Sequence, residues 1–468
     1  MALNDRVFPY LTTALWDPSI HRPDLKALPS TIPLTPVAAV LPPLIYYLAL
    51  LLLPPFPRQS YNIAISAVRS ILALTAGVLF FRLPLAYHVP FSIGLTYQLA
   101  LVGLYGGCRV LDAFFISPYL FNHIPRRVKY HHVPRDESPG EVLARRRSNS
   151  YFSLHSLQPK QGAVTETAVT DSGWPHSWAD RASWAIELEL SMRGAGFTWS
   201  SADVRHTKKT WRPSVKDRAH SILVHVLPVL GGSWIIIRYI YTCYLHDGAR
   251  STSDFDDLPL YIQMLLTAAL GGFLMSAFSL GHSMFAILLA PLAPHPLSYF
   301  PPLYTLRIWD LTSVRDFWSY GWHRLFSRLF LVYGVWPGEF IERKLTGKTA
   351  YQPADVGKVL GGFFSSAFVH SFAAYTVVGG VLDNALGETK FFAGCGVAVV
   401  VEEVIKRLVL AQRRKQKQWQ VKERSDDMKR WYDGIIGRVW WVSVLLYTGR
   451  NFARGWVAAV LVREMSGL

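Results

Sequence analysis

Long apolar runs recur along the chain, and their lengths suit helices that cross a membrane. A hydrocarbon core about 30 Å thick is spanned by about 20 apolar residues in a helix. The pattern predicts an all-α, polytopic integral membrane protein with about eight to ten transmembrane helices. The apolar runs lie at 31–54, 62–81, 91–116, 221–242, 258–290, 355–380, 391–410 and 436–462.

Three stretches depart from a simple span. The run at 258–290 is long enough to tilt or to hold two parts. The run at 436–462 contains Arg450 and Arg454, so it is either two short helices or one helix with a polar face. Residues 325–341 are apolar but short and broken by a proline, which favours an interfacial or re-entrant segment.

The composition agrees with a membrane protein. Of the 468 residues, 51% are hydrophobic and 17% are charged, whereas soluble domains carry about 25% charged residues. The net charge of +16 has no basic stripe interleaved with aromatic residues, so we expect a lipid bilayer as partner and no nucleic acid. Cys108, Cys243 and Cys395 lack the spacing of a zinc site, and we expect no metal.

The charges divide unevenly between the polar stretches. Residues 121–218 and 411–430 are strongly basic, whereas the predicted loops at 243–257 and 381–390 carry acidic residues. Placing the basic loops in the cytoplasm alternates correctly through the predicted helices. The endoplasmic reticulum is the expected membrane.

This organisation predicts three parts. The N-terminal transmembrane helices occupy 1–120, and a basic cytoplasmic insert occupies 121–218. The Ser-, Gln- and Thr-rich stretch at 136–170 inside the insert is expected to be a flexible linker. The third part, 219–468, holds the remaining apolar runs and the candidate chemistry.

A histidine lies inside the apolar run at 355–380. The sequence VLGGFFSSAFVHSFAAYTVVGG places His370 near the middle of an uncharged helix among small residues. Ionisable groups are costly at membrane depth, so a functional role is the first hypothesis, and a histidine bonded to a neighbouring helix is the alternative. A neutral imidazole in a dry site can accept the proton of a hydroxyl that attacks an acyl thioester. We therefore predict that His370 is a general base.

A second segment, RDFWSYGWHRLFSRLF at 315–330, combines aromatic and ionisable residues. An interfacial aromatic belt would explain its tryptophans. A belt does not require Asp316 and His323, which at helical spacing would share one face of a helix. Acyl transfer needs a second polar group to orient the hydroxyl or to stabilise the oxyanion, and these two residues are the candidates.

Other polar residues favour structural roles. Arg109 and Asp112 are expected to form an interfacial pair. Glu402 and Glu403 are spaced to pair with basic residues one helical turn later. His282 is interpreted as a core histidine, and the alternative is that it lines the same cavity as the candidate base.

Three segments resemble a known family. DFWSYGWHR resembles the D-F-W-x-x-x-W-H-x pattern of the wax synthase-like branch of the membrane-bound O-acyltransferase superfamily, and FSSAFVHSF is similar to its catalytic-histidine helix. ELELSMRGAGFTWSSADVR, at 187–205, is similar to the R-G-x-G-W-type segment of fungal members, with Phe197 where Trp is usual. The three occur in the family's order, and the resemblance covers roughly 185–465.

The resemblance implies a helical fold around a catalytic tunnel, with an acyl-CoA donor from the cytoplasm and a lipophilic alcohol acceptor from the bilayer. It makes 219–468 a wax synthase-like acyltransferase core. Fungal chains of this type act in secondary metabolism, so acetyl transfer from acetyl-CoA to a terpenoid or polyketide alcohol is expected by analogy. No tightly bound cofactor is implied. Carried over by position, the catalytic residues are His370, His323 and Asp316, and the substrate-binding residues are Phe317, Trp318 and Trp322.

Alternatives remain at this point. Arg315 and Arg324 are expected to contact the phosphates of CoA, although a cytoplasmic loop would carry basic residues in any case. A long-chain wax ester synthase uses the same CoA head group and is the second enzyme reading. A membrane transporter or scaffold is the non-enzyme reading, although no inverted repeat is visible in the sequence.

Overall fold

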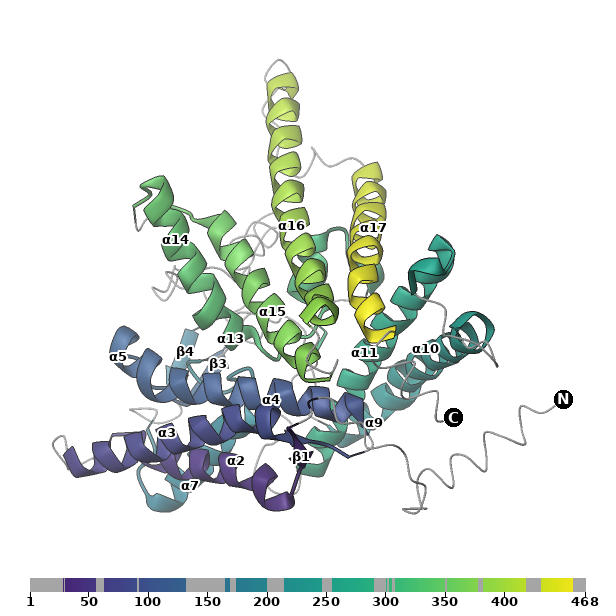
Figure 1. Ribbon diagram of the computed structural model, residues 1–468. Coiled ribbons are helices and arrows are strands. Elements are labelled where there is room, and N and C mark those ends of the chain that lie inside the picture. Colours follow the sequence, from purple (N-terminus) through teal and green to yellow (C-terminus); the bar gives the residue numbers. More distant parts are fainter. Residues whose placement is uncertain are drawn as a thin grey trace.

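Helices dominate the computed structural model (Figure 1). The linker predicted at 136–170 lies outside the described residues except at 165–168, as does the 418–430 part of the second basic stretch. The structure describes residues 28, 30–55, 63–90, 92–131, 165–168, 174–199, 214–245, 255–289, 300, 303–304, 308–349, 352–377, 382–417 and 431–457.

Within the described residues, every predicted apolar run contains or lies within a helix. The run at 258–290 is one helix rather than two, and the run at 436–462 falls in one helix as far as Trp456. The acidic stretch at 381–390, predicted as a loop, is helical from Leu382 onward. The helices are α2 (Pro36–Leu51), α3 (Ile63–Ala86), α4 (Ile93–Leu111), α10 (Leu227–Ile240), α11 (Leu260–Leu289), α15 (Asp355–Val377), α16 (Leu382–Lys417) and α17 (Trp431–Trp456).

Four helical segments within the described ranges are long and apolar enough to cross a membrane. They are α3, Ile93–Phe121, Val215–Leu245 and α11. Helix α2 is apolar but shorter. The protein is therefore an integral membrane protein, and the larger number of membrane helices drawn from the sequence stays a prediction.

Local sequence explains where the helix beginning with α4 starts and stops. The Ser92 hydroxyl accepts a hydrogen bond from the Leu95 N–H at 3.2 Å and caps the first turn. The helix passes through a π-helical turn, η1 (Asp112–Ile116), into α5 (Ser117–Phe121). It ends at Asn122, whose φ of 46° lies in the left-handed region that Asn tolerates.

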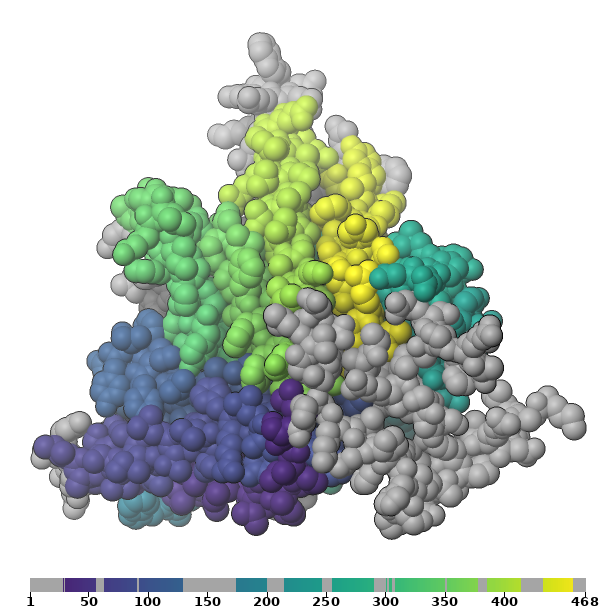
Figure 2. Space-filling model, in the orientation of Figure 1, coloured from purple at the N-terminus to yellow at the C-terminus, as the bar shows by residue number. Residues whose placement is uncertain are grey.

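The helices form a lower layer and a fan above it (Figure 1). Helices α2, α3 and α4 make up the lower layer, and α14 (Trp336–Thr346), α15, α16 and α17 rise from it. Leu101 and Leu104 of α4 share a hydrophobic core with Val369 and Ala373 of α15. The N-terminal helices make the broad lower part of the face in Figure 2, above which α14 stands apart from the upper end of α16. The contact between α4 and α15 thus joins the lower layer of helices to the fan. It lies at the part of α15 that carries His370, the predicted general base.

Part of the predicted insert packs on the N-terminal helices. Helix α7 (Trp178–Leu190) lies against α2, and Trp184 and Phe197 are fully buried in the same cluster as residues of α2 and α3. Their rings meet edge to face with centroids 6.0 Å apart. The R-G-x-G-W-type segment therefore belongs to the folded core. Two short sheets complete the fold: β1 (Ile32–Pro33) parallel with β2 (Tyr87–His88), and β3 (Val128–His131) antiparallel with β4 (Thr165–Ala168).

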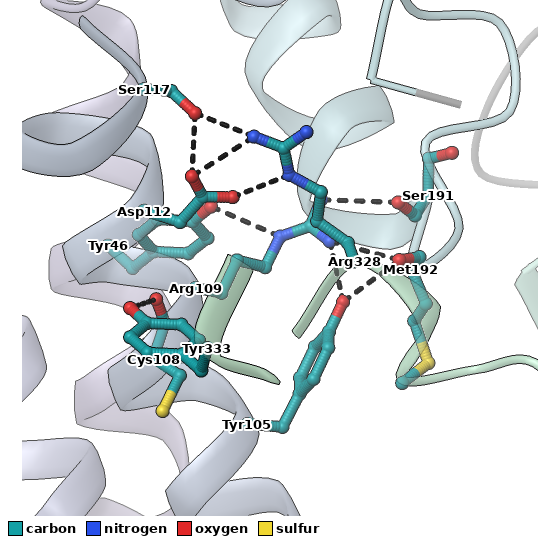
Figure 3. A network of polar contacts seen from close by, with 10 residues as sticks. All are labelled: Tyr46, Tyr105, Cys108, Arg109, Asp112, Ser117, Ser191, Met192, Arg328 and Tyr333. Carbon is teal, nitrogen blue, oxygen red and sulfur yellow. Dashed lines mark hydrogen bonds and ion pairs between the residues drawn. The ribbon is translucent and has the colours of Figure 1, made fainter. Parts of the chain in front are cut away.

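A buried polar network ties this segment to α4 (Figure 3). The Arg109 guanidinium donates to the backbone carbonyls at the end of α7, where the helix dipole places negative charge. The Tyr105 hydroxyl accepts from Arg109 and donates to the Met192 carbonyl at 3.0 Å. The acceptors of Arg109 are the hydroxyls of Tyr46 (3.2 Å) and Tyr105 (2.6 Å) and the carbonyls of Leu188, Ser191 (3.2 Å) and Met192 (3.3 Å).

The predicted pairing of Arg109 with Asp112 is wrong. The Asp112 carboxylate accepts from Arg328 of α13 (Ser327–Phe330) at 2.7 and 3.1 Å and from the Ser117 hydroxyl at 2.6 Å. Arg109 instead points toward α7, as Figure 3 shows. Each charge has its own distant partner, and together they connect α4 to two separate parts of the chain.

Glycines allow a close crossing between α15 and the helix before it. A Cβ added at Gly334 would collide with the Gly361 carbonyl, and one at Gly338 with the Gly357 carbonyl. The reverse additions, at Gly357 and Gly361, would collide with the carbonyls of Gly338 and Gly334. Small residues at such positions let helix backbones approach closely. The crossing fixes the axial position of α15, and therefore that of His370.

We expect Gly338→Ala to destabilise the protein by about 1–3 kcal/mol, because the added methyl group overpacks this crossing. The measurement is the thermal unfolding midpoint in detergent. Gly231→Ala on α10 is the matched control, because its added Cβ would meet no atom within 4 Å. Equal midpoints for the two variants would show that the crossing tolerates the extra volume.

Candidate active site

His370 lies at the centre of the fold, on the face of α15 that meets α4 and α16. It is only 6% exposed. Its Nδ1 lies 2.8 Å from the Tyr97 hydroxyl of α4. Phe392 of α16 stacks on the imidazole, with centroids 4.6 Å apart and an interplanar angle of 22°. Nε2 makes no hydrogen bond within the described part of the chain.

The segment that contains the W-H motif is not one continuous helix. A short helix, α12 (Val314–Asp316), continues as a π-helical turn, η8 (Phe317–Gly321), and Trp322 is extended, with φ of −112° and ψ of 157°. The expectation that Asp316 and His323 share a helical face is therefore wrong, because the helix ends between them. Single π-helical turns occur frequently at functional sites.

His323 lies inside the protein near His370. It is 6% exposed, and ring contacts that run through Trp322, Trp318 and Phe392 connect it to His370. Phe278 of α11 and Phe326 pack around its ring, with centroids 4.9 and 5.9 Å away. Both ring nitrogens are buried without a hydrogen bond to any described residue. A buried histidine with both nitrogens unmatched is costly unless a ligand or water completes it.

Asp316 has a different setting. Its Oδ2 accepts a hydrogen bond from the Thr312 hydroxyl at 3.2 Å, and its backbone N–H donates to the Ser313 cap at 2.9 Å. These contacts hold the first turn of α12. Among the described residues it makes no hydrogen bond to His323 or His370. Its catalytic role stays a prediction.

The aromatic residues of the motif form a cluster against three helices. Phe317 is buried and stacks on Trp441 of α17 at 5.7 Å, with an interplanar angle of 16°. Trp318 contacts Trp322 at 5.7 Å and Phe392 at 5.4 Å. This packing differs from an interfacial belt, because the rings face neighbouring helices. Trp318 thereby touches the ring that stacks on His370. Substrate contacts of the three residues stay a prediction.

The arginines expected at CoA have partners inside the protein. Arg315 forms an ion pair with Glu403 of α16 at 3.3 Å. Arg324 is buried, and its guanidinium lies 5.7 Å from the Tyr320 ring centroid. The predicted pairs one turn apart are confirmed: Glu402 with Lys406 at 2.6 Å and Glu403 with Arg407 at 3.3 Å. Binding of CoA by Arg315 and Arg324 stays a prediction.

Three residues around the candidate site were not predicted from the sequence: Tyr97, which contacts His370, and Trp456 and Glu388, which contact each other. Glu388 is 2% exposed and accepts a hydrogen bond from the Trp456 indole at 3.0 Å. The sequence signal was an acid next to an apolar run, but it was assigned to a loop. Tyr97 and Trp456 carry no signal of their own, since they are aromatic residues in apolar stretches. Within the described ranges, no three His, Cys, Asp or Glu side chains gather as metal ligands do.

An apolar groove runs along the glycine crossing between α14 and α15. Its volume is about 660 Å³. Leu360, Phe364 and Phe368 line it along α15, and it reaches Leu104 of α4 and Val369. Phe364 and Phe368 are exposed on the protein surface. The groove therefore leads from the outside of the fan to the residue that precedes His370.

These observations describe an integral membrane protein with two buried histidines and an apolar groove that reaches Val369. Residues 300–394, which include the W-H segment and His370, match the Membrane bound O-acyl transferase family. The similarity to this family is shown for that segment, which holds both candidate histidines.

Two curated relatives are similar to the chain at low identity. The acetyltransferase eriL of Hericium erinaceus is 24% identical over 237 residues, which is 49% of this chain and 58% of the relative. The acetyltransferase ple2 of Rhodocybe pseudopiperita is 24% identical over 293 residues, 61% of this chain and 68% of the relative. The chain thus spans less than two thirds of the first of them. No solved structure shows a significant match.

Proposed function

We propose that the protein is a membrane-embedded O-acyltransferase that moves an acetyl group from acetyl-CoA to a hydroxyl of a lipophilic secondary metabolite, a terpenoid or a polyketide. The observation that carries the proposal is the setting of His370. The imidazole is buried, Nδ1 is held by Tyr97, and Nε2 has no hydrogen bond among the described residues. That is the arrangement a general base requires.

In the proposed reaction, Nε2 of His370 takes the hydroxyl proton while the oxygen attacks the thioester carbonyl. The tetrahedral intermediate then collapses, the carbon–sulfur bond breaks, and the proton passes from His370 to the leaving thiolate of CoA. The products are the acetyl ester and CoA with a free thiol. Water must be kept out, because it would hydrolyse the thioester. The rings of Phe392, Trp318 and Phe278 supply apolar walls around the two histidines.

His323 is the proposed second polar group. An imidazole that donates one N–H can bind the developing oxyanion or orient the attacking hydroxyl. Its burial without a hydrogen bond to any described residue favours such a role. The position of His323 in the sequence is that of the family's upstream polar residue, which supports the same assignment.

The groove between α14 and α15 supports a lipophilic acceptor. Its lining is almost wholly apolar, and exposed phenylalanines border it. A ring system or isoprenoid chain dissolved in the membrane would bind such a surface by burial of apolar area. The preference for acetyl rests on the two relatives, which are named as acetyltransferases. A long-chain wax ester synthase is the second candidate, because the groove would also hold an acyl chain.

The test uses membranes that contain the full chain, radiolabelled acetyl-CoA or palmitoyl-CoA, and a panel of terpenoid, polyketide and fatty alcohols. We expect an acetyl ester of at least one terpenoid or polyketide alcohol, and about 10²–10⁴-fold less ester in membranes that carry His370→Ala. Transfer of palmitoyl to fatty alcohols, without acetyl transfer, would replace the proposal by wax ester synthesis. Equal ester formation in both membranes would contradict His370 as the base.

A further inference from the structure

Helix α16 supplies a hydrogen-bond acceptor to α12, the short helix that leads into the W-H segment. The first N–H groups of a helix have no acceptor within the helix itself. In α12, the Asp316 N–H is capped by the Ser313 hydroxyl, whereas the Val314 N–H donates to Oε2 of Glu402 at 2.8 Å. Val314 is 0% exposed, so this N–H depends on a protein acceptor. Glu402 lies 88 positions away in the chain and completes the start of α12.

Both oxygens of the Glu402 carboxylate have partners. The residue is 6% exposed. Its Oε1 lies 2.6 Å from Nζ of Lys406, whose side chain is 42% exposed. A buried carboxylate is costly unless partners of this kind satisfy its oxygens. The pair with Lys406 would form equally well at the surface of α16. The bond to Val314 is therefore the contact that accounts for the burial of Glu402.

Helix α17 holds the same stretch of chain from a second direction. The Trp441 indole donates to the Leu311 carbonyl at 3.1 Å, and its ring stacks on Phe317. Gly437, about one turn earlier on α17, lies so close to the Thr312 carbonyl that an added Cβ would collide with it. Helices α16 and α17 pack along each other (Figure 1). Together they fix residues 311–317.

Helix α16 also carries the ring that covers the candidate base. Phe392 stacks on His370 and contacts Trp318 of the W-H segment, with centroids 4.6 and 5.4 Å away. Trp318 packs on Trp322, which adjoins His323 with ring centroids 5.2 Å apart. Phe392 lies ten residues before the buried carboxylate, which is about 15 Å along a helix. One helix therefore contacts both the base and the start of the segment that carries the second histidine.

We propose that Glu402 is a positioning residue for the reaction: its carboxylate fixes the start of α12 on α16 and thereby sets the place of His323 relative to His370. Phe392 and Glu402 are the two points of contact, and the helix between them keeps their separation constant. The catalytic meaning of this inference rests on the proposed function, whereas the hydrogen bond to Val314 does not depend on any substrate.

The test compares two replacements of Glu402 by hydrogen–deuterium exchange of the full chain in lipid nanodiscs. Glu402→Gln keeps a side-chain oxygen that can accept from Val314, whereas Glu402→Met keeps the length and removes the acceptor. We expect the Val314 amide to exchange about tenfold or more faster in Glu402→Met, and within about threefold of the wild type in Glu402→Gln. Unchanged exchange in Glu402→Met would overturn the proposal. So would an equal increase in α4, since that would show general loosening.

Lys406→Met is the matched control. It removes the ion pair from the same carboxylate and leaves the acceptor of Val314 in place. Exchange at Val314 should match the wild type, and a loss of protection as large as in Glu402→Met would contradict the assigned role. If Glu402→Met does not fold, Glu402→Asp replaces it, because the shorter side chain keeps the charge but withdraws the acceptor. Wild-type exchange in Glu402→Asp would then overturn the proposal.

A kinetic readout links this contact to catalysis. With the acceptor found in the membrane assay, Glu402→Met should lower kcat by about tenfold or more, because small displacements of reacting groups are costly. KM for acetyl-CoA should stay within about twofold, and Glu402→Gln should keep kcat within about threefold. Equal losses of kcat in the two variants, or a loss through KM alone, would contradict positioning. If the protein transfers no acyl group from either donor, the proposed function fails, whereas the exchange result still decides whether Glu402 holds α12.

Discussion

His370→Ala should leave a folded, membrane-inserted protein whose acyl transfer falls by about 10²–10⁴-fold, the usual contribution of a positioned base. The reason is that no other described side chain can take the place of its Nε2. Tyr97 contacts Nδ1, and Phe392 stacks on the face of the ring. Ester formation in membranes, normalised to protein amount, measures the loss. A monodisperse elution profile in detergent shows that the variant is folded.

His282→Gln is the matched control for this prediction. His282 is also a histidine in an apolar helix, and its ring lies against Phe300 with centroids 5.5 Å apart. Its variant should keep activity within about threefold, as expected when no transition-state contact is removed. An inactive His282→Gln together with an active His370→Ala would move the catalytic base from α15 to α11.

The apolar runs predicted the helices well, because the length of an apolar run can be read from the local sequence. What they could not predict is how each helix begins, bends and ends. The run at 391–410 begins nine residues earlier, at Leu382, and this shift carries Glu388 from a predicted loop into the core. Acidic residues near the start of a helix resemble loop residues in a sequence, whereas the burial of Glu388 beside Trp456 depends on the tertiary structure.

The candidate site was likewise predicted only in part from the sequence. His370 and the W-H segment stand out in the sequence because an ionisable residue among apolar ones is rare. Asp316 and His323 were linked by helical spacing, but the turn η8 and the extended Trp322 break that spacing. Tyr97 and Trp456 come from helices hundreds of residues apart in the chain, and only the packing of the helices brings Trp456 against Tyr97 and Tyr97 to the imidazole of His370.

The ion pair between Asp112 and Arg328 supports the second large prediction, on stability. The Asp112 side chain is 3% exposed and that of Arg328 13%, and their atoms approach to 2.7 Å (Figure 3). Asp112→Asn leaves a buried guanidinium without its counter-charge, which typically costs about 3–5 kcal/mol. The guanidinium also lies 4.9 Å from the Trp199 ring centroid, so the R-G-x-G-W-type segment should loosen as well.

Heating followed by fluorescence-detected size-exclusion chromatography measures the effect as a lower midpoint for loss of the folded peak. Arg407→Gln is the control, because its pair with Asp355 is 63% and 53% exposed and exposed pairs contribute about 0–1 kcal/mol. The double variant Asp112→Asn, Arg328→Gln should be less destabilised than the sum of the single variants, by about 0.5–3 kcal/mol, because the second change removes the stranded charge. Additive losses would show that the two residues act independently, and that the junction between α4 and α13 depends on packing rather than on this charge pair.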